Sequence, residues 1–287
     1  MTEAEWDAGG DPAALLSFLG ERASHRKRRL YACACARRIR HLLKSPASEE
    51  AIAAAELFAD GLIGEARLGE CEQAARQASA RAVREAHTVW SLGPAALTAR
   101  AAWVGVWAAC AAENTCDRFG PPGVEAGSLE IGFQGCLAVR TAQVASWARS
   151  VAEELSEAHA DDPGTETALF FSFLRGLKTT VQRIEAAVRD GIETCETVWQ
   201  AQLVREIFDH PFQARPPFDP TWREANGGLV SRIAEGIYHE RAWGDLPILA
   251  DALEDAGCDD AGLLEHLHTP GLHVRGCWGL DTILGRA

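Results

Sequence analysis

The sequence lacks the patterns of β-structure and of membrane insertion. No segment shows Val, Ile, Thr and Tyr alternating with polar residues, as a β-strand with one buried face would. The apolar residues instead recur with the period of an α-helix throughout the chain. The longest uncharged apolar run, residues 101–112, is too short to cross a bilayer. The acidic first eleven residues contain no apolar stretch of the kind found in secretory signals. We therefore expect an all-α fold, a cytoplasmic location and no membrane partner.

A surplus of positive charge and a regular cysteine spacing are also missing. Acidic residues outnumber basic ones by 41 to 28, and the net charge of −13 excludes binding to nucleic acid or anionic lipid through the overall field. The nine cysteines are scattered without a CxxC pair, which indicates free thiols in a reducing compartment. No phosphate-binding loop, dinucleotide fingerprint or nucleophile elbow occurs. These absences argue against an enzyme, and we assign no catalytic residue.

The sequence does contain a succession of helical patterns separated by clear stop signals. Asp11 and Pro12 are typical of the start of a helix. Further helices are expected over residues 24–43, 48–58, 65–90, 95–116, 133–158 and 165–208. Residues 209–221 then carry four of the twelve prolines. We predict a helical body over residues 1–210 and a C-terminal helical subdomain over residues 222–287, joined by this proline-rich segment.

The C-terminal subdomain has the most clearly bounded helices. The expected ranges are roughly 227–242, 245–256, 259–268 and 273–284. Asp245 and Gly257 bound the second of them, and Asp259 or Asp260 caps the third. Short helices of this kind cannot bury a face alone and pack as pairs, and the last one is similar to the second helix of a HEAT repeat. We predict an irregular helical array of HEAT- or armadillo-like pairs, especially at the C-terminus, without a fixed repeat period.

Both ends of the chain resemble an uncharacterised bacterial family abundant in planctomycetes. The resemblance lies in MTEAEWDAGGDPAALLSFLGERASHRKRRLYACACARRIRHLL, in residues 207–212, and in LPILADALEDAGC…HVRGCW…LG. The family has no established activity, so the resemblance implies no function. Relatives often carry adjacent cysteines before the arginine pair, whereas this chain has Cys35-Ala36-Arg37-Arg38. That departure argues against an obligatory metal or redox pair among the N-terminal cysteines.

Five cysteines and histidines gather near the C-terminus, where they suggest a zinc site. Cys258, His266, His273 and Cys277 offer thiolate and imidazole, the ligands that zinc prefers, with His268 as an alternative to His266. His273 and Cys277 are four residues apart, so we expect them on one face of the last helix. The spacing matches no standard zinc finger. The other interpretation is that Cys258 and Cys277 fill helix interfaces while the histidines cap helices or face solvent.

A second feature is a basic segment, in which eight of the nineteen residues 22–40 are Lys or Arg. A helical wheel places six of them opposite the apolar stripe of Tyr31 and Cys35: Arg26, Lys27, Arg29, Arg37, Arg38 and Arg40. Guanidinium groups pair well with carboxylate and phosphate, so this face could bind an acidic protein or a nucleic acid. Alternatively, it is a solvated face that is neutralised by the chain's own acidic residues.

These features lead to two functional hypotheses. The first is a cytoplasmic helical protein-interaction or scaffold module that binds an acidic partner, another protein, through the basic helix and needs no cofactor. The second is a metal-binding protein that is stabilised by zinc, or a metal-dependent enzyme, with its site in the C-terminal Cys/His cluster. The sequence favours the first hypothesis because no catalytic constellation is recognisable.

Overall fold

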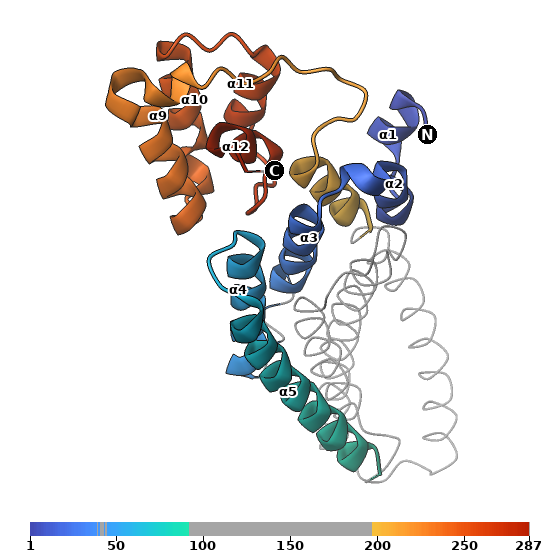
Figure 1. Ribbon diagram of the computed structural model, residues 1–287. Coiled ribbons are helices and arrows are strands. Elements are labelled where there is room, and N and C mark those ends of the chain that lie inside the picture. The colour runs from blue at the N-terminus through green and yellow to red at the C-terminus, as the bar shows by residue number, and fades with distance from the viewer. Residues whose placement is uncertain (39, 41–42, 44, 92–196, 287) are drawn as a thin grey trace, which may run out of the picture.

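The computed structural model describes residues 1–38, 40, 43, 45–91 and 197–286 (Figure 1). These residues form helices joined by turns, and none of them lies in a β-strand, which confirms the all-α prediction. The helices expected over residues 95–116 and 133–158, and most of the one expected over 165–208, lie outside the described residues. HEAT- or armadillo-like pairing and the division into two domains stay predictions.

The N-terminal part contains three short helices and one turn of 3-10 helix. They are α1 (Glu3–Ala8), α2 (Pro12–Leu19), η1 (Gly20–Arg22) and α3 (His25–Arg38). Thr2 and Glu5 form a capping box at α1, and the Asp11 side chain accepts a hydrogen bond from the Ala13 backbone at α2. These helices share a core with the helical residues 197–207. That core contains Trp6, Leu15, Leu16, Tyr31, Val204 and Ile207.

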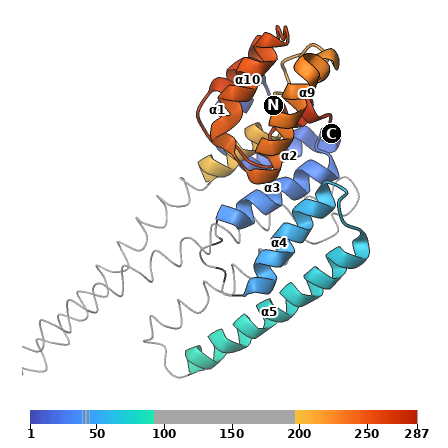
Figure 2. The ribbon, with the colours of Figure 1, turned by 90° about the vertical axis from the view of Figure 1, so that its left-hand side faces the viewer.

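The next two helices, α4 (Pro46–Ala59) and α5 (Glu65–Ser91), form an antiparallel hairpin against α3 (Figures 1 and 2). Leu68, Cys71, Ala75 and Ala78 of α5 are buried at a three-four-three spacing, which puts them on one helical face. Their small side chains allow α4 and α5 to approach closely. Figures 1 and 2 show α5 running away from the C-terminal helices, so the far end of the hairpin takes no part in the site described below.

The C-terminal part begins after a segment without helix, residues 208–220. It contains α9 (Thr221–Glu240), η3 (Trp243–Asp245), α10 (Leu246–Asp255), α11 (Ala261–His268) and α12 (Trp278–Leu284). Residues 225–228 interrupt α9 with non-helical backbone angles, so its regular part begins near the predicted residue 227. Gly257, with φ of +87°, ends the turn after α10, and Asp260 caps α11 by accepting from the Leu263 backbone. These boundaries agree with the sequence signals.

The last helix is shorter than expected. The prediction of a helix over residues 273–284 is wrong at its start, because residues 269–277 are not helical and α12 begins at Trp278. Gly276 has φ of +93°, and a Cβ atom there would lie 2.9 Å from Leu30 of α3. The turn at Gly276 thus brings residues 269–277, called the 269–277 segment below, against the N-terminal core instead of continuing α12. Among the described residues, no helix has the length and apolarity needed to cross a membrane.

Candidate metal centre

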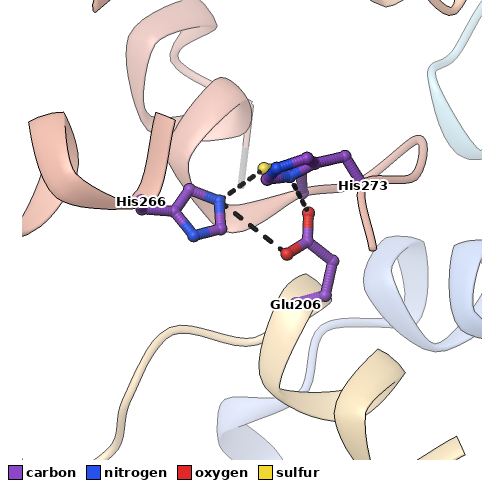
Figure 3. A group of neighbouring side chains, drawn as sticks. Glu206, His266 and His273 are labelled. Carbon is purple, nitrogen blue, oxygen red and sulfur yellow. Dashed lines mark hydrogen bonds and ion pairs between the residues drawn. The ribbon is translucent and has the colours of Figure 1, made fainter. Parts of the chain in front are cut away.

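Four potential metal ligands meet where the C-terminal helices contact the helical residues 197–207 (Figure 3). Glu206 comes from residues 197–207, His266 from the last turn of α11 and His273 from the 269–277 segment. Cys277 is the residue before α12. One ligand atom from each of the four lies within 4.8 Å of the other three. The set, called the Glu206 cluster below, therefore combines a carboxylate, two imidazoles and a thiol from three separate parts of the fold.

The distances within the Glu206 cluster are those of direct contact. Nε2 of His266 lies 3.0 Å from Sγ of Cys277 and 3.8 Å from Oε2 of Glu206. Nδ1 of His273 lies 3.0 Å from Oε1 of the same carboxylate. The other nitrogen of His273, Nε2, lies 3.1 Å from the backbone oxygen of Thr269. The imidazole of His273 is thus held at both nitrogens, with Nδ1 directed toward the cluster (Figure 3).

The surroundings of the Glu206 cluster exclude most water. The Cys277 side chain is fully buried, and those of Glu206 and His273 are each 8% exposed. The His266 ring packs at 4.5 Å between centroids against Trp278, and the guanidinium of Arg215 covers that indole at 3.8 Å. Because little water reaches these groups, each buried polar group needs a hydrogen bond from another member of the cluster or a bond to a metal ion.

Burial shifts the protonation of every member of the cluster. Loss of solvation raises the pKa of Cys277 well above its usual value, and the charge of Glu206 adds to this. Loss of solvation, then the nearby His273, lower the pKa of His266 to about 3. Desolvation is the largest effect on His273 and acts to lower its pKa, but the hydrogen bond to Glu206, the charge of Glu206 and the contact with the Thr269 carbonyl together outweigh it, and the pKa is raised. Without a metal, these shifts favour the Cys277 thiol over the thiolate, the protonated form of His273 and the neutral form of His266.

The donor set and its spacing are compatible with a tetrahedral ion. Zinc binds thiolate, imidazole and carboxylate at about 2.0–2.3 Å, which places neighbouring ligand atoms about 3.3–3.8 Å apart. Three separations in the cluster, 3.0, 3.0 and 3.8 Å, lie within a few tenths of an ångström of this range, and all four ligand atoms lie within 4.8 Å of one another. Histidine ligands of metals usually donate their second N–H to a carbonyl or carboxylate, and the Thr269 carbonyl stands in that position for His273.

The structure brings together three of the four residues that the sequence indicated as zinc ligands. His266, His273 and Cys277 meet, but Cys258 does not belong to the group and is buried in the C-terminal core after α10. The expectation that His273 and Cys277 share a helical face is wrong, because both precede α12. They meet because the 269–277 segment turns back at Gly276. The alternative ligand His268 is exposed, beside the exposed Asp251 and Glu254.

Glu206 was not identified from the sequence, although a signal for it exists. It stands three residues after Leu203 and directly before Ile207, and both of these are fully buried. A glutamate on the apolar face of a helix is unusual, because a buried carboxylate needs a partner. Its partner, His273, is 67 residues away in sequence, so no local pattern connects the two.

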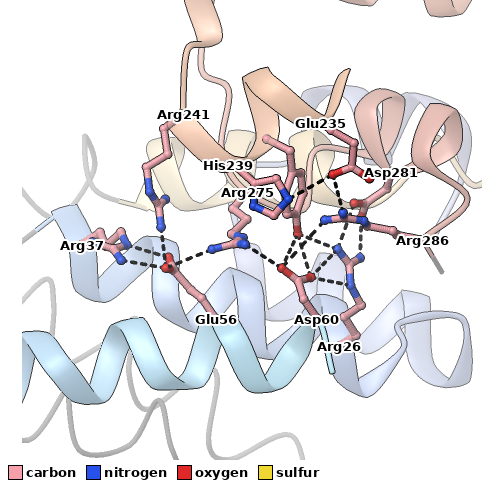
Figure 4. A network of polar contacts seen from close by, with 11 residues as sticks. Arg26, Arg37, Glu56, Asp60, Glu235, His239, Arg241, Arg275, Asp281 and Arg286 are labelled. Carbon is pink, nitrogen blue, oxygen red and sulfur yellow. Dashed lines mark hydrogen bonds and ion pairs between the residues drawn. The ribbon is translucent and has the colours of Figure 1, made fainter. Parts of the chain in front are cut away.

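Four arginine and three carboxylate side chains form a second polar assembly (Figure 4). Arg26 of α3 lies 2.6 Å from Asp281 of α12 and 3.0 Å from Asp60, which follows α4. Arg275 lies 2.9 Å from Asp60, and Arg37 lies 2.6 Å from Glu56 of α4. Arg241 also pairs with Glu56. These pairs join the N-terminal helices to α9, α12 and the 269–277 segment.

The same contacts correct the expectation of one solvated basic face. Arg26 and Lys27 are 13% and 15% exposed, and Lys27 donates to the Ile207 carbonyl as well as lying near Asp281. Arg29 is buried against the Phe58 ring, and Arg37 pairs with Glu56. The carboxylates of α4 and α12, remote in sequence, draw these side chains into the fold.

Of the six residues of the predicted basic face, Arg38 and Arg40 are the exposed ones. Arg38 lies over the Trp199 ring at 4.4 Å, and Arg40 is 62% exposed and pairs with Glu49. Binding of an acidic protein or of a nucleic acid to the six basic residues stays a prediction.

Comparison with known proteins adds no function to this geometry. No protein-family model, curated protein or solved structure matches the chain. The resemblance to a planctomycete family therefore stays a prediction, and functional inference rests on the side chains themselves.

Proposed function

We propose that this protein binds one structural zinc ion through Glu206, His266, His273 and Cys277. The ion would fasten α11, α12 and the 269–277 segment to the helical residues 197–207. The observation that carries the proposal is the convergence of these four ligand atoms within 4.8 Å. Such convergence of a carboxylate, a thiol and two imidazoles in a buried place brings together three separate parts of the chain, which packing alone does not require.

The donor set favours zinc over other divalent ions. Calcium and magnesium take oxygen ligands, and this cluster offers a single carboxylate. Thiolate and imidazole together suit zinc, which accepts tetrahedral geometry without preference from d-electrons. A reducing cytoplasm, in which Cys277 stays available as a ligand, agrees with the proposal, and the described cysteines are all free.

The number of protein ligands favours a structural role. Catalytic zinc sites have three protein ligands and keep one position for water, whereas structural sites close all four positions. Here four protein ligands are available and the thiol is fully buried. The charges also balance, because a divalent cation would neutralise the Glu206 carboxylate and a Cys277 thiolate together. We therefore propose that the ion stabilises the fold and does not bind a substrate.

Titration of metal-stripped protein with zinc in the presence of a competing chelator tests the proposal. The wild-type chain should bind one zinc ion, and Cys277→Ala or Glu206→Gln should weaken binding by at least about 100-fold. Cys258→Ala is the matched control, since Cys258 is also a buried cysteine of the same core, and it should bind as the wild type does. Equal affinity of Cys277→Ala and wild type would refute the proposal.

A further inference from the structure

A separate pocket lies between α3, α4, the helical residues 197–207 and the 269–277 segment. Its volume is about 500 Å³, within the range of roughly 300–1,000 Å³ that is usual for sites that bind small molecules. Part of its lining is apolar and aromatic: Leu30, Ala34, Trp199, Trp243, Leu272 and Val274. None of the four members of the Glu206 cluster lines it. The pocket is therefore a site distinct from the proposed zinc site.

The rest of the lining is strongly basic. It carries Arg37, Arg38, Arg40, Arg241 and Arg275. Glu56 is the one carboxylate among the described lining residues, and it pairs with Arg37 and Arg241. Glu49 and Asp60 lie outside the lining and pair with Arg40 and Arg275. Even with these two included, five guanidinium groups face three carboxylates, a surplus of two positive charges in a chain of net charge −13.

The crowding of guanidinium groups at this pocket also affects their protonation. Burial, together with the positive charges of Arg37 and Arg275, lowers the pKa of Arg241. An anion in the pocket would offset this mutual repulsion.

We propose that this pocket binds a small organic molecule with a flat apolar body and two negative charges, carried by phosphate or carboxylate. The guanidinium groups would pair with the anionic end, since their planar forks match phosphate and carboxylate oxygens. The apolar body would lie against Trp199, Trp243 and the aliphatic side chains opposite. A hollow of this volume suits a small molecule better than a protein surface or a nucleic-acid backbone.

Calorimetric titration of the full chain with two flat dianions, adenosine monophosphate and naphthalene disulfonate, tests the proposal. At least one should bind at a single site with a Kd below about 1 mM. Adenosine lacks the charge and inorganic phosphate lacks the apolar body, so each should bind at least about tenfold more weakly. If neither dianion binds, or if phosphate alone binds as tightly, the proposal is wrong.

Three variants locate the binding. The double substitution Arg38→Gln with Arg40→Gln changes two exposed arginines and should weaken dianion binding at least about tenfold. Ala34→Leu would fill the apolar side and should weaken it without any change of charge. Arg67→Gln is the matched control, because Arg67 is an exposed arginine of α5 that pairs with Glu70 outside the pocket. Dianion affinity that is unchanged in Ala34→Leu and in the double variant would overturn the assignment.

Discussion

Nδ1 of His273 lies 3.0 Å from Oε1 of Glu206, although the two residues are 67 positions apart in sequence. This contact joins the 269–277 segment to the helical residues 197–207 at the centre of the Glu206 cluster. It also fixes the ring of His273, whose other nitrogen contacts the Thr269 carbonyl. A pre-oriented imidazole beside a buried carboxylate and thiol is the arrangement from which the zinc proposal follows.

Zinc binding should release protons and weaken at acidic pH. Burial, reinforced by Glu206, raises the pKa of Cys277, and contact with Glu206 raises that of His273 against the effect of desolvation. A raised pKa means that Cys277 holds its proton at neutral pH without metal and that His273 is protonated more often than a free imidazole, and zinc must displace these protons. The apparent affinity should fall about tenfold per pH unit for each proton released. Calorimetric titration with zinc in buffers of different protonation enthalpy should show that about one to two protons are released per zinc ion bound at pH 7. Release of none would contradict the assignment of Cys277 as a ligand.

Removal of the Asp281 charge should destabilise the fold strongly. Its carboxylate is 1% exposed and contacts both Arg26 and Lys27, so Asp281→Asn would leave Arg26 with Asp60 as its other carboxylate and would remove the negative charge beside Lys27. Breaking a buried ion pair from one side costs about 3–5 kcal/mol of unfolding free energy. Urea unfolding measures this loss. Glu70→Gln, at an exposed pair with Arg67, is the control and should cost less than about 1 kcal/mol. If Asp281→Asn lowers the free energy of unfolding by no more than the control does, the ion pairs of Asp281 contribute little to stability.

The turn at Gly276 should resist substitution. Gly276→Ala would place Cβ 2.9 Å from Cδ1 of Leu30 while keeping φ near +93°, so it should cost about 1–3 kcal/mol. Gly69→Ala makes the same chemical change inside α5, where nothing lies within 4 Å, and should instead stabilise the protein by about 0.5–1 kcal/mol. Thermal unfolding of both variants compares the two sites. A Gly276→Ala protein as stable as the wild type would mean that the turn is not constrained as described.

Removal of zinc should also weaken binding of a dianion to the pocket. Leu272 and Val274 line the pocket, while His273 between them belongs to the Glu206 cluster. Loss of the ion would release the 269–277 segment and with it one wall of the pocket. Titration of adenosine monophosphate into stripped and zinc-loaded protein measures this coupling, which rests on both proposals. Equal affinities in the two forms would show that dianion binding does not depend on zinc. The variants of the pocket would then still test the pocket proposal by itself.

The helix boundaries that depend on local chemistry could be predicted from the sequence. Asp11 and Pro12 start α2, Asp260 caps α11 and Gly257 follows α10, because these residues act on the backbone beside them. The start of α12 could not be predicted in this way. It is set by the packing of Gly276 against Leu30, a contact between opposite ends of the chain.

The candidate site shows the same limit. Its three members near the C-terminus stand out by residue type, whereas Glu206 joins them only through the tertiary fold. The basic segment was recognisable from its composition, but the burial of Arg26 and Lys27 depends on Asp281, 255 residues after Arg26. Local patterns therefore indicate which residues carry chemistry, and long-range contacts decide which of them meet.

The most direct test of the account is the metal content of purified, tag-free protein, measured by elemental analysis of the wild type and of the Cys277→Ala and Cys258→Ala variants. We predict one zinc ion per chain in the wild type and in Cys258→Ala, and none in Cys277→Ala. A wild-type chain that contains no zinc and takes up none on addition would contradict the account, as would zinc that persists in the Cys277→Ala variant.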